Sequence, residues 1–468
     1  MRYDRFFRRI CRGLLFGAVA AFPGQAQAAV TALAGATVLD GSGAAPIADA
    51  VVIIEDGRIA GIGPAGRVNI PPGAQVHMLD GKWILPGLID AHVHFFQSGG
   101  LYTRPDIIDL RHIRPYAREI ATIRRQLPDT LARYTASGVT SVVDLAGPDW
   151  VYGLRGLSGE LPAAPRVALS GPGLAPYLPP GLDGRDAPAI VVRTPEQARA
   201  GVRRLATRTP DVIKIWFEPA PGMELDEEFL WVQAAIDTAH AHGLRVAVHA
   251  TRRELARRML AAGADILVHG IDDRPVDGEL LAQMRAGDVL YIPTLGVSRR
   301  YAEVLGRQLR LSAFERVRGD PAVIASLDDM DRLFPGQGRR SGLPDDRTAR
   351  ANLLRVHGAG IRVAAGSDAG NIGSLHGPAL HRELELMVQA GLAPLQVLTA
   401  ATRGGAAVMG RGDELGRLAA GYRADLLVLE DSPLVDIRNT RRIVLVMVGG
   451  RVVHCVASRL PEGCPDGS

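Results

Sequence analysis

The sequence predicts an α/β protein, in which a (β/α)8 TIM barrel carries a small β-sandwich domain formed from both ends of the chain. Three observations support this fold class. Short β-rich runs separated by Gly, Asp and Pro turns occupy both ends, strand-like and helical runs alternate between them, and the strand-like runs of the middle number eight. The 468 residues are enough for a barrel of about 250 residues and a smaller companion domain.

Residues 1–28 have the layout of a secretory signal peptide. An arginine-rich start precedes an apolar stretch over residues 14–22, and a final Ala-Gln-Ala supplies the small residues that a signal peptidase recognises. The apolar stretch is shorter than the roughly 20 residues of a membrane span. We therefore expect cleavage after Ala28, a mature protein without a membrane span, and a periplasmic or secreted location.

The formal net charge of +4 lies in this leader, which contains five arginines and one aspartate. Residues 29–468 are neutral overall, so they lack the basic surface of a nucleic-acid-binding protein. Hydrophobic residues make up 47% of the chain, which excludes a largely disordered protein. We expect a small-molecule substrate and no nucleic-acid partner, and the sequence leaves a homo-oligomer open.

The small β-sandwich domain is expected over residues 29–85 and 411–468. Its predicted strands are 34–39, 50–55, 58–62, 75–79, 425–429, 443–448 and 451–455. Cys455 and Cys464 lie near the C-terminus, where they can form a short-loop disulfide or remain free thiols.

The barrel is expected over residues 86–410. Its predicted strands are 88–94, 140–145, 166–170, 212–216, 245–249, 265–269, 289–293 and 361–366, and predicted helices lie at 195–207, 227–242, 252–262 and 347–357. The connection over about 298–346 is too long for a bare loop, so we expect an insertion there, for which a lid is one interpretation.

Potential metal ligands stand at the ends of several predicted barrel strands. His92 and His94 are two residues apart on one strand and therefore point the same way, although an isolated pair of this kind is more often part of a core. His249, His269 and Asp368 end three other strands. Because the carboxyl ends of barrel strands open on one face, we expect these five side chains to form a metal cluster.

Lys214 is the sixth expected member of this cluster. Only two of the 54 basic side chains are lysines, and Lys214 lies within an apolar strand. Desolvation favours a neutral, nucleophilic amine, which can add carbon dioxide to form a carbamate that bridges two metal ions. The alternatives are an ion pair with Glu218 or Asp211, or a lysine that forms a Schiff base with substrate.

These motifs resemble the amidohydrolase superfamily, and within it the exported members similar to imidazolonepropionase. The segments that carry the resemblance are 86–94, 212–216, 248–250, 268–270 and 366–370. The resemblance implies two divalent metal ions, of the zinc type, bridged by a hydroxide and by a carboxylated Lys214. It places His92, His94 and Asp368 on the more buried metal, and His249 and His269 on the more exposed one.

The resemblance also bears on the substrate. Imidazolonepropionase uses one metal and lacks the bridging lysine, whereas the members with this lysine include dipeptidases and amidases of acylated amino acids. We therefore expect metal-dependent hydrolysis of a C–N amide bond in a dipeptide or an N-acyl amino acid, with Asp368 as metal ligand and as general base and acid. Alternatives are a lactone or other ester hydrolase, a Schiff-base lyase that uses Lys214, and a catalytically silent metal-binding protein.

Two further residues are expected to contact substrate. Arg252 follows His249 and can bind a carboxylate with two hydrogen bonds, unless it is an ordinary charged residue at a helix start. His376 lies in the loop after Asp368 and can donate a hydrogen bond to the substrate carbonyl, unless it is a surface histidine.

Overall fold

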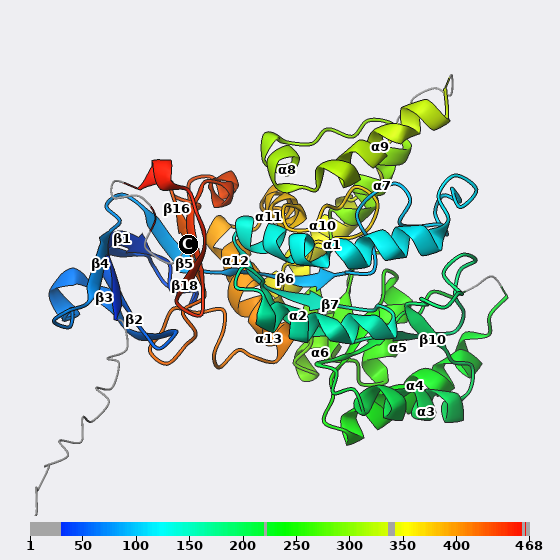
Figure 1. Cartoon of the computed structure of the whole chain (residues 1–468). Coiled ribbons are helices and arrows are strands. Elements are labelled where there is room, and N and C mark those ends of the chain that lie inside the picture. The colour runs from blue at the N-terminus through cyan, green and yellow to red at the C-terminus, as the bar shows by residue number, and fades with distance from the viewer. Residues whose placement is uncertain (1–29, 220–221, 336–341, 461–463, 465–468) are drawn as a thin grey trace, which may run out of the picture.

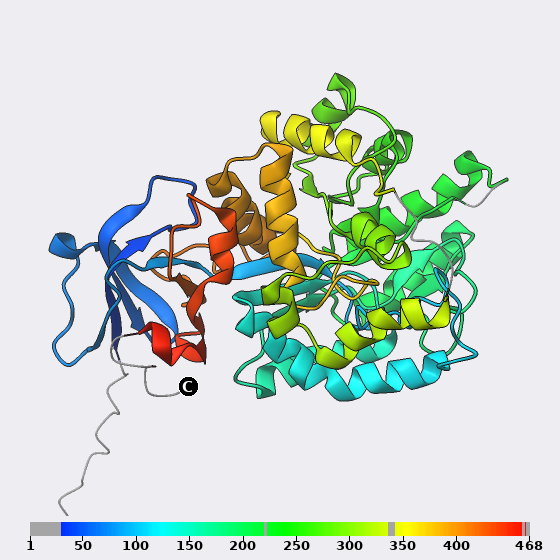
Figure 2. The ribbon, with the colours of Figure 1, turned by 90° about the horizontal axis from the view of Figure 1, so that it is seen from above.

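The structure is a computed structural model that describes residues 30–219, 222–335, 342–460 and 464. Figure 1 shows a β-sheet body built from the first and last parts of the chain, beside a larger body of strands and helices. Figure 2, seen from above, shows the same two bodies side by side. The predicted signal peptide, residues 1–28, lies outside the described residues.

Both ends of the chain contribute to one eight-stranded sheet, as the sequence predicts. Its strands run in the order β18-β17-β16-β5-β1-β2-β3, and β4 also pairs with β1. These strands are β1 (Thr31–Val38), β2 (Ile47–Glu55), β3 (Arg58–Pro64), β4 (Gln75–Met78), β5 (Trp83–Pro86), β16 (Leu426–Leu429), β17 (Ile443–Val448) and β18 (Arg451–Cys455). The antiparallel pair of β5 and β16 joins the two chain ends.

The interior of this sheet body is a separate apolar core. Leu33, Val52, Ile84, Val428 and Val444 belong to one buried cluster, whose members come from both ends of the chain. A disulfide joins Cys455 at the end of β18 to Cys464.

The larger body is the predicted barrel of parallel strands. Its strands are β6 (Leu88–Val93), β7 (Val139–Asp144), β8 (Arg166–Leu169), β11 (Ile213–Ile215), β12 (Val246–His249), β13 (Ile266–Val268), β14 (Leu290–Ile292) and β15 (Arg362–Val363). Backbone hydrogen bonds close the two seams: Ala91 donates to Ala365 across β6 and the β15 segment, and Asp211 donates to Leu169 beside β8. The short strands β9 (Gly173–Ala175) and β10 (Ala189–Val191), which were not predicted, extend the sheet beside β11.

Helices cover the outside of the barrel. They are α1 (Tyr116–Ala136), α2 (Leu154–Glu160), α3 (Pro195–Ala206), α4 (Leu225–Ala241), α5 (Arg253–Ala261), α6 (Gly278–Ala286), α10 (Arg347–Gly358), α11 (Ala379–Ala390), α12 (Pro394–Thr399) and α13 (Gly405–Met409). Apolar residues of these helices pack against the strands in one large buried cluster, except those of α13, which belong to a second cluster with other residues of the barrel strands. None of the described helices has the length and hydrophobicity needed to cross a membrane.

The long connection between β14 and α10 is largely helical. It forms α7 (Val297–Leu305), α8 (Ala313–Arg318) and α9 (Pro321–Leu333), which lie at one side of the barrel in Figure 1. Val304, Leu327 and Met330 of this segment share a buried cluster with Leu101 from the loop after β6. The segment is therefore packed on that loop, close to the ends of the barrel strands.

Candidate metal-dependent active site

The six predicted metal-site residues line one cavity at the carboxyl ends of the barrel strands. His92 is the penultimate residue of β6, His249 ends β12, and Lys214 lies in β11. His94, His269 and Asp368 follow β6, β13 and β15. All six are part of the wall of a cavity of about 280 Å³, so residues spread over the whole barrel sequence meet at one place.

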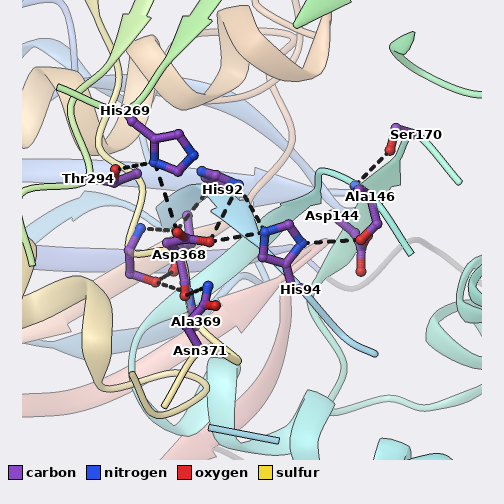
Figure 3. A network of polar contacts seen from close by, with 12 residues as sticks. His92, His94, Asp144, Ala146, Ser170, His269, Thr294, Asp368, Ala369 and Asn371 are labelled. Carbon is purple, nitrogen blue, oxygen red and sulfur yellow. Dashed lines mark hydrogen bonds and ion pairs between the residues drawn. The ribbon is translucent and has the colours of Figure 1, made fainter. Parts of the chain in front are cut away.

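Three of these side chains make close contacts with one another. The Nε2 atoms of His92 and His94 are 3.2 Å apart, and Asp368 Oδ1 lies 3.0 Å from His94 Nε2 and 3.5 Å from His92 Nε2 (Figure 3). Ligand atoms around one tetrahedral zinc ion are about 3.3 Å apart. The separations of these three atoms therefore fit a shared metal ion.

His269 stands next to this group. Ligand atoms of His92, His269 and Asp368 lie within 4.8 Å of one another, and His269 Nδ1 is 3.9 Å from Asp368 Oδ2. The rings of His249 and His269 have centroids 4.4 Å apart, but Nε2 of His249 faces Glu218 Oε2 at 3.5 Å. His249 is thus adjacent to the cluster while one of its nitrogens contacts a carboxylate from the loop after β11.

Neighbouring polar groups orient these ligands. His94 Nδ1 lies 3.1 Å from the carbonyl oxygen of Ala146, and His269 Nδ1 lies 2.8 Å from Thr294 Oγ1 (Figure 3). When Nδ1 of His94 donates to this carbonyl, its Nε2 presents a lone pair to the cluster, which is the tautomer a metal ligand needs. His92 Nδ1 is buried without a hydrogen-bond partner among the described residues.

The backbone around the cluster is strained and tightly packed. His269 and Asp368 have φ angles of 78° and 54°, a left-handed conformation that is uncommon for residues other than glycine. A Cβ atom at Gly366 would lie 2.9 Å from His92 Cβ, and one at Gly370 would lie 2.4 Å from the carbonyl oxygen of His94. Glycine is therefore needed on both sides of Asp368, and the surrounding contacts hold the strained loop in place.

Lys214 is buried in the cavity wall. Its side-chain nitrogen has no hydrogen-bond partner among the described residues, and burial lowers the pKa of the amine to about 7. Among the described residues, Lys214 forms no ion pair with Glu218 or Asp211, the two partners that the sequence suggests. Glu218 pairs with Arg252 instead, and Asp211 pairs with Arg155. A buried amine without a partner is costly unless a further group contacts it.

Burial favours the neutral form of three imidazoles in the cavity. Burial holds the pKa of His92 and of His269 well below its usual value and lowers the pKa of His249. Burial alone would raise the pKa of Asp368, but the proximity of the His92 and His94 rings, with a hydrogen bond from His94, outweighs it and holds this pKa well below the usual range. Neutral imidazoles and an ionised carboxylate are the forms that bind a metal ion.

Other acids are buried close to the cluster. Burial raises the pKa of Asp90 and of Asp144 to about 7, and the pKa of Glu383 to about 8. Asp90 accepts a hydrogen bond from the backbone of Ser367 at 2.8 Å, which ties the end of β6 to the loop after β15. Burial therefore favours the protonated form of these acids, and a bound cation would shift them toward the ionised form.

The two predicted substrate contacts do not lie on the cavity wall. Arg252 is half exposed and donates to Glu218 at 2.8 Å. His376 is buried, with Nδ1 2.8 Å from the hydroxyl of Tyr134 and Nε2 2.8 Å from the carbonyl oxygen of Gln97. Both nitrogens of His376 are already engaged, so it supports the loop after β6 rather than reaching into the cavity. Arg252 lies outside because it extends to the Glu218 carboxylate.

The structure adds cavity residues that the sequence analysis did not single out. They include Gln97, Arg104, Trp216, Tyr301 and Asn371. Gln97 and Asn371 each follow a predicted ligand by three residues, so this proximity in sequence was an available signal. Arg104 and Tyr301 lie in long connections, and no pattern in the sequence indicates that they face the same cavity.

Comparison with known proteins agrees with this geometry. Residues 83–453 match the family model described as "Amidohydrolase family". Imidazolonepropionase of Stenotrophomonas maltophilia (strain R551-3) is 27% identical over 471 residues, which cover 92% of this chain and 95% of that protein.

Solved structures show the same fold. A protein from Bifidobacterium longum, assigned as a prolidase, is 28% identical with a TM-score of 0.67, covering 91% of this chain and 94% of that one. A Xaa-Pro dipeptidase with methionine in its active site has 21% identity and a TM-score of 0.67, covering 91% and 99% of the two chains.

The barrel and the His/His/Asp group define a metal-dependent hydrolase. The chain belongs to the amidohydrolase family, whose enzymes act on C–N bonds.

Proposed function

We propose that this chain hydrolyses the amide bond of a dipeptide or an N-acyl amino acid, with two divalent metal ions and a carboxylated Lys214. The observation that carries this proposal is the unpartnered, buried amine of Lys214 on the same cavity wall as His92, Asp368 and the other imidazoles. A neutral amine adds carbon dioxide at its nitrogen and releases one proton, which yields a carbamate with two oxygen ligands. A metal ion bound beside this carbamate would neutralise its negative charge.

The residues divide into two sets of ligands. His92, His94 and Asp368 would hold one ion, His249 and His269 would hold the other, and the carbamate of Lys214 would contact both. Imidazole and carboxylate ligands favour zinc among the common divalent ions. When bound, the metal ions lower the pKa of a water molecule and polarise the carbonyl of the substrate.

Asp368 has the position of the proton carrier. Its carboxylate is ionised at neutral pH and lies on the cavity wall, so it can accept a proton from the attacking water. The water oxygen forms a bond to the carbonyl carbon, the C–N bond breaks, and Asp368 returns the proton to the leaving nitrogen. His92 and His94 contact the same carboxylate and fix its orientation during both transfers.

The substrate class is supported by one relative of known structure. The protein of Bifidobacterium longum assigned as a prolidase, a peptidase, is among the similar structures with more than 25% identity. A bridging lysine argues against imidazolonepropionase activity, because the family resemblance gives that enzyme a single metal. Lactones or other esters are the nearest alternative, since the same groups can act on an ester carbonyl.

The decisive experiment measures carboxylation and activity together. Protein grown with ¹³C-bicarbonate should give a carbamate carbon signal that is absent from Lys214→Ala. The variant should lose at least about 1,000-fold in kcat, and propionate should restore part of it because a free carboxylate can occupy the vacated space. Lys82→Ala is the matched control, because Lys82 pairs with Glu430 in the sheet body.

Three results would overturn the proposal. One is full activity of Lys214→Ala, and another is a metal content of one ion or none in bicarbonate-grown protein. The third is the absence of turnover for a panel of dipeptides and N-acyl amino acids. Trapping of substrate on Lys214 by borohydride would instead support a Schiff-base lyase.

We also propose that the protein is exported to the periplasm or secreted. This proposal is supported by the signal-peptide pattern of residues 1–28 and by the disulfide between Cys455 and Cys464, a bond that persists in oxidising compartments. Fractionation of cells that produce the full chain, with N-terminal sequencing of the product, tests it. A product that retains Met1 in the cytoplasm would refute export.

A further inference from the structure

One wall of the cavity carries polar groups that hydrolysis itself does not use. Gln97 and Arg104 lie in the loop after β6, and Asn371 lies in the loop after Asp368. The two loops are packed together, because a Cβ atom at Gly370 would lie 3.1 Å from Gln97 Cβ. These groups therefore stand beside the metal ligands and on the same side of the cavity.

Gln97 is a buried amide without a partner. Gln97 is only 3% exposed, and its side chain makes no hydrogen bond to the described residues. Its Oε1 atom is fully buried and unpaired, and the residue is part of the cavity wall. Because no hydrogen bond engages the Nε2 group of Gln97 among the described residues, its N–H groups can donate to a ligand that carries an acceptor.

Arg104 presents a fixed positive charge to the same cavity. Its Nε and Nη2 donate to the two carboxylate oxygens of Asp106, at 2.8 and 2.6 Å. Its Nη1 donates to the hydroxyl of Tyr301 at 2.8 Å and to Asn371. A guanidinium has five N–H groups, so one N–H of Nη2 is left for a ligand.

The contacts of Arg104 also hold it rigidly. Asn371 accepts from both Arg104 and Tyr301. Its side-chain nitrogen donates to the backbone oxygen of Asp368 at 3.1 Å (Figure 3). A guanidinium that is held in place loses little conformational entropy when a ligand binds. Arg252, by contrast, is half exposed, pairs with Glu218 and does not line the cavity.

We propose that Gln97 and Arg104 form the subsite that receives a carboxylate of the substrate. The inference rests on the proposed function, since both a dipeptide and an N-acyl amino acid carry a free carboxylate. One carboxylate oxygen accepts from the unused N–H of Arg104, and the amide of Gln97 donates to the carboxylate. The subsite makes the enzyme selective for amides whose leaving amine carries this acid group.

The test compares matched probes with and without the carboxylate. Pairs of N-acyl amino acids and the corresponding N-acyl amino alcohols, such as N-acetyl-L-leucine and N-acetyl-L-leucinol, differ only in this group. For the metal-loaded enzyme we expect kcat/KM to favour the carboxylate about 10- to 100-fold, the range of one or two charge-assisted hydrogen bonds. Calorimetry should show the same preference in binding.

Four variants localise the preference. Arg104→Gln should bring the carboxylate-to-alcohol ratio close to one. Gln97→Glu should lower the ratio about tenfold or more, because it places a second negative charge beside the substrate, while Gln97→Met serves as its shape-matched control. Arg252→Gln should leave the ratio unchanged.

The subsite and the proposed function fail in different ways. No turnover of any pair by enzyme with two bound metals refutes amide hydrolysis and removes the basis of the subsite. Equal turnover and equal binding of the two probes, or an unchanged ratio in Gln97→Glu, refutes the subsite while amide hydrolysis stands. If Arg104→Gln does not fold, Gln97→Glu decides alone, because Gln97 makes no side-chain hydrogen bond that its replacement would break.

Discussion

The two halves of the candidate metal site differ in how completely the protein assembles them. In the inner half, His92, His94 and Asp368 already contact one another at 3.0 to 3.5 Å. In the outer half, His249 faces Glu218, and Lys214 has no partner among the described residues. The inner half therefore owes its geometry to the fold, whereas the outer half needs added groups to become complete.

The largest expected effect comes from breaking the inner half. Asp368→Asn keeps the size of the side chain but removes the charge and the proton acceptor, so kcat should fall about 10⁴-fold. Steady-state kinetics together with metal analysis checks this. Asp90→Asn is the comparison variant, because Asp90 accepts a hydrogen bond from Ser367 but does not line the cavity. Its kcat should fall less than that of Asp368→Asn. Near-normal turnover by Asp368→Asn would exclude the assigned role.

Breaking the outer half should cost less and should change metal content. His269→Ala should leave about one tightly bound ion per chain and lower kcat about 100- to 1,000-fold. Thr294→Val removes only the hydroxyl that lies 2.8 Å from His269 Nδ1, so kcat should fall only about tenfold. Elemental analysis after dialysis measures the stoichiometry. Retention of two ions by His269→Ala would contradict the division into halves.

The stability of the segment that carries Thr294, next to the outer half, should depend on pH. Glu383 accepts hydrogen bonds from the backbone of Leu295 and Gly296, just after Thr294, and burial raises its pKa to about 8. Since this pKa is above the unfolded value, the fold favours the protonated acid, and stability is lost as the pH rises from about 4.5 through 8. At about 1.4 kcal/mol per pKa unit, we expect the free energy of unfolding to fall by up to about 5 kcal/mol over this window.

Denaturant titrations at pH 5, 7 and 9 measure this dependence. In Glu383→Gln the titrating group is absent, so the decrease with pH should be smaller than in the unchanged protein. Identical pH profiles for the two proteins would show that Glu383 does not carry the effect.

The smallest expected effect concerns Glu218. Glu218→Gln weakens the contact that Oε2 makes with His249, so the affinity of the outer half for metal should rise about threefold. The effect is small because Glu218 is partly exposed and its interactions are screened by solvent. Competition with a chelator measures the affinity, with Arg252→Gln as control. A drop of 100-fold or more would instead identify Glu218 as a ligand.

Much of the fold could be predicted from the sequence because its signals are local. The alternation of strands and helices, and the strands at both ends, follow from hydrophobic periodicity. The short strands β9 and β10 have only three residues each, which is too few for a periodic pattern. The helices between β14 and α10 were anticipated only as an insertion, because loop length does not specify structure.

The candidate site could be predicted in part for a similar reason. His92, His94, His249, His269 and Asp368 mark the ends of predicted strands, and barrel topology brings such ends together. No comparable rule predicts which residues contact the substrate. Arg252 was expected in the cavity, but its guanidinium pairs with Glu218, and Arg104 was overlooked because a long irregular loop brings it there.

The pairing of β5 with β16 has a consequence for biogenesis. The first strands of the sheet body emerge from the ribosome more than 300 residues before the strand that completes their sheet. Until then β5 exposes an open edge that can pair with another chain. A chain that ends before residue 426 lacks β16, so the edge of β5 stays unpaired. We expect such a truncated chain to aggregate rather than to fold into a barrel that lacks only its C-terminal strands.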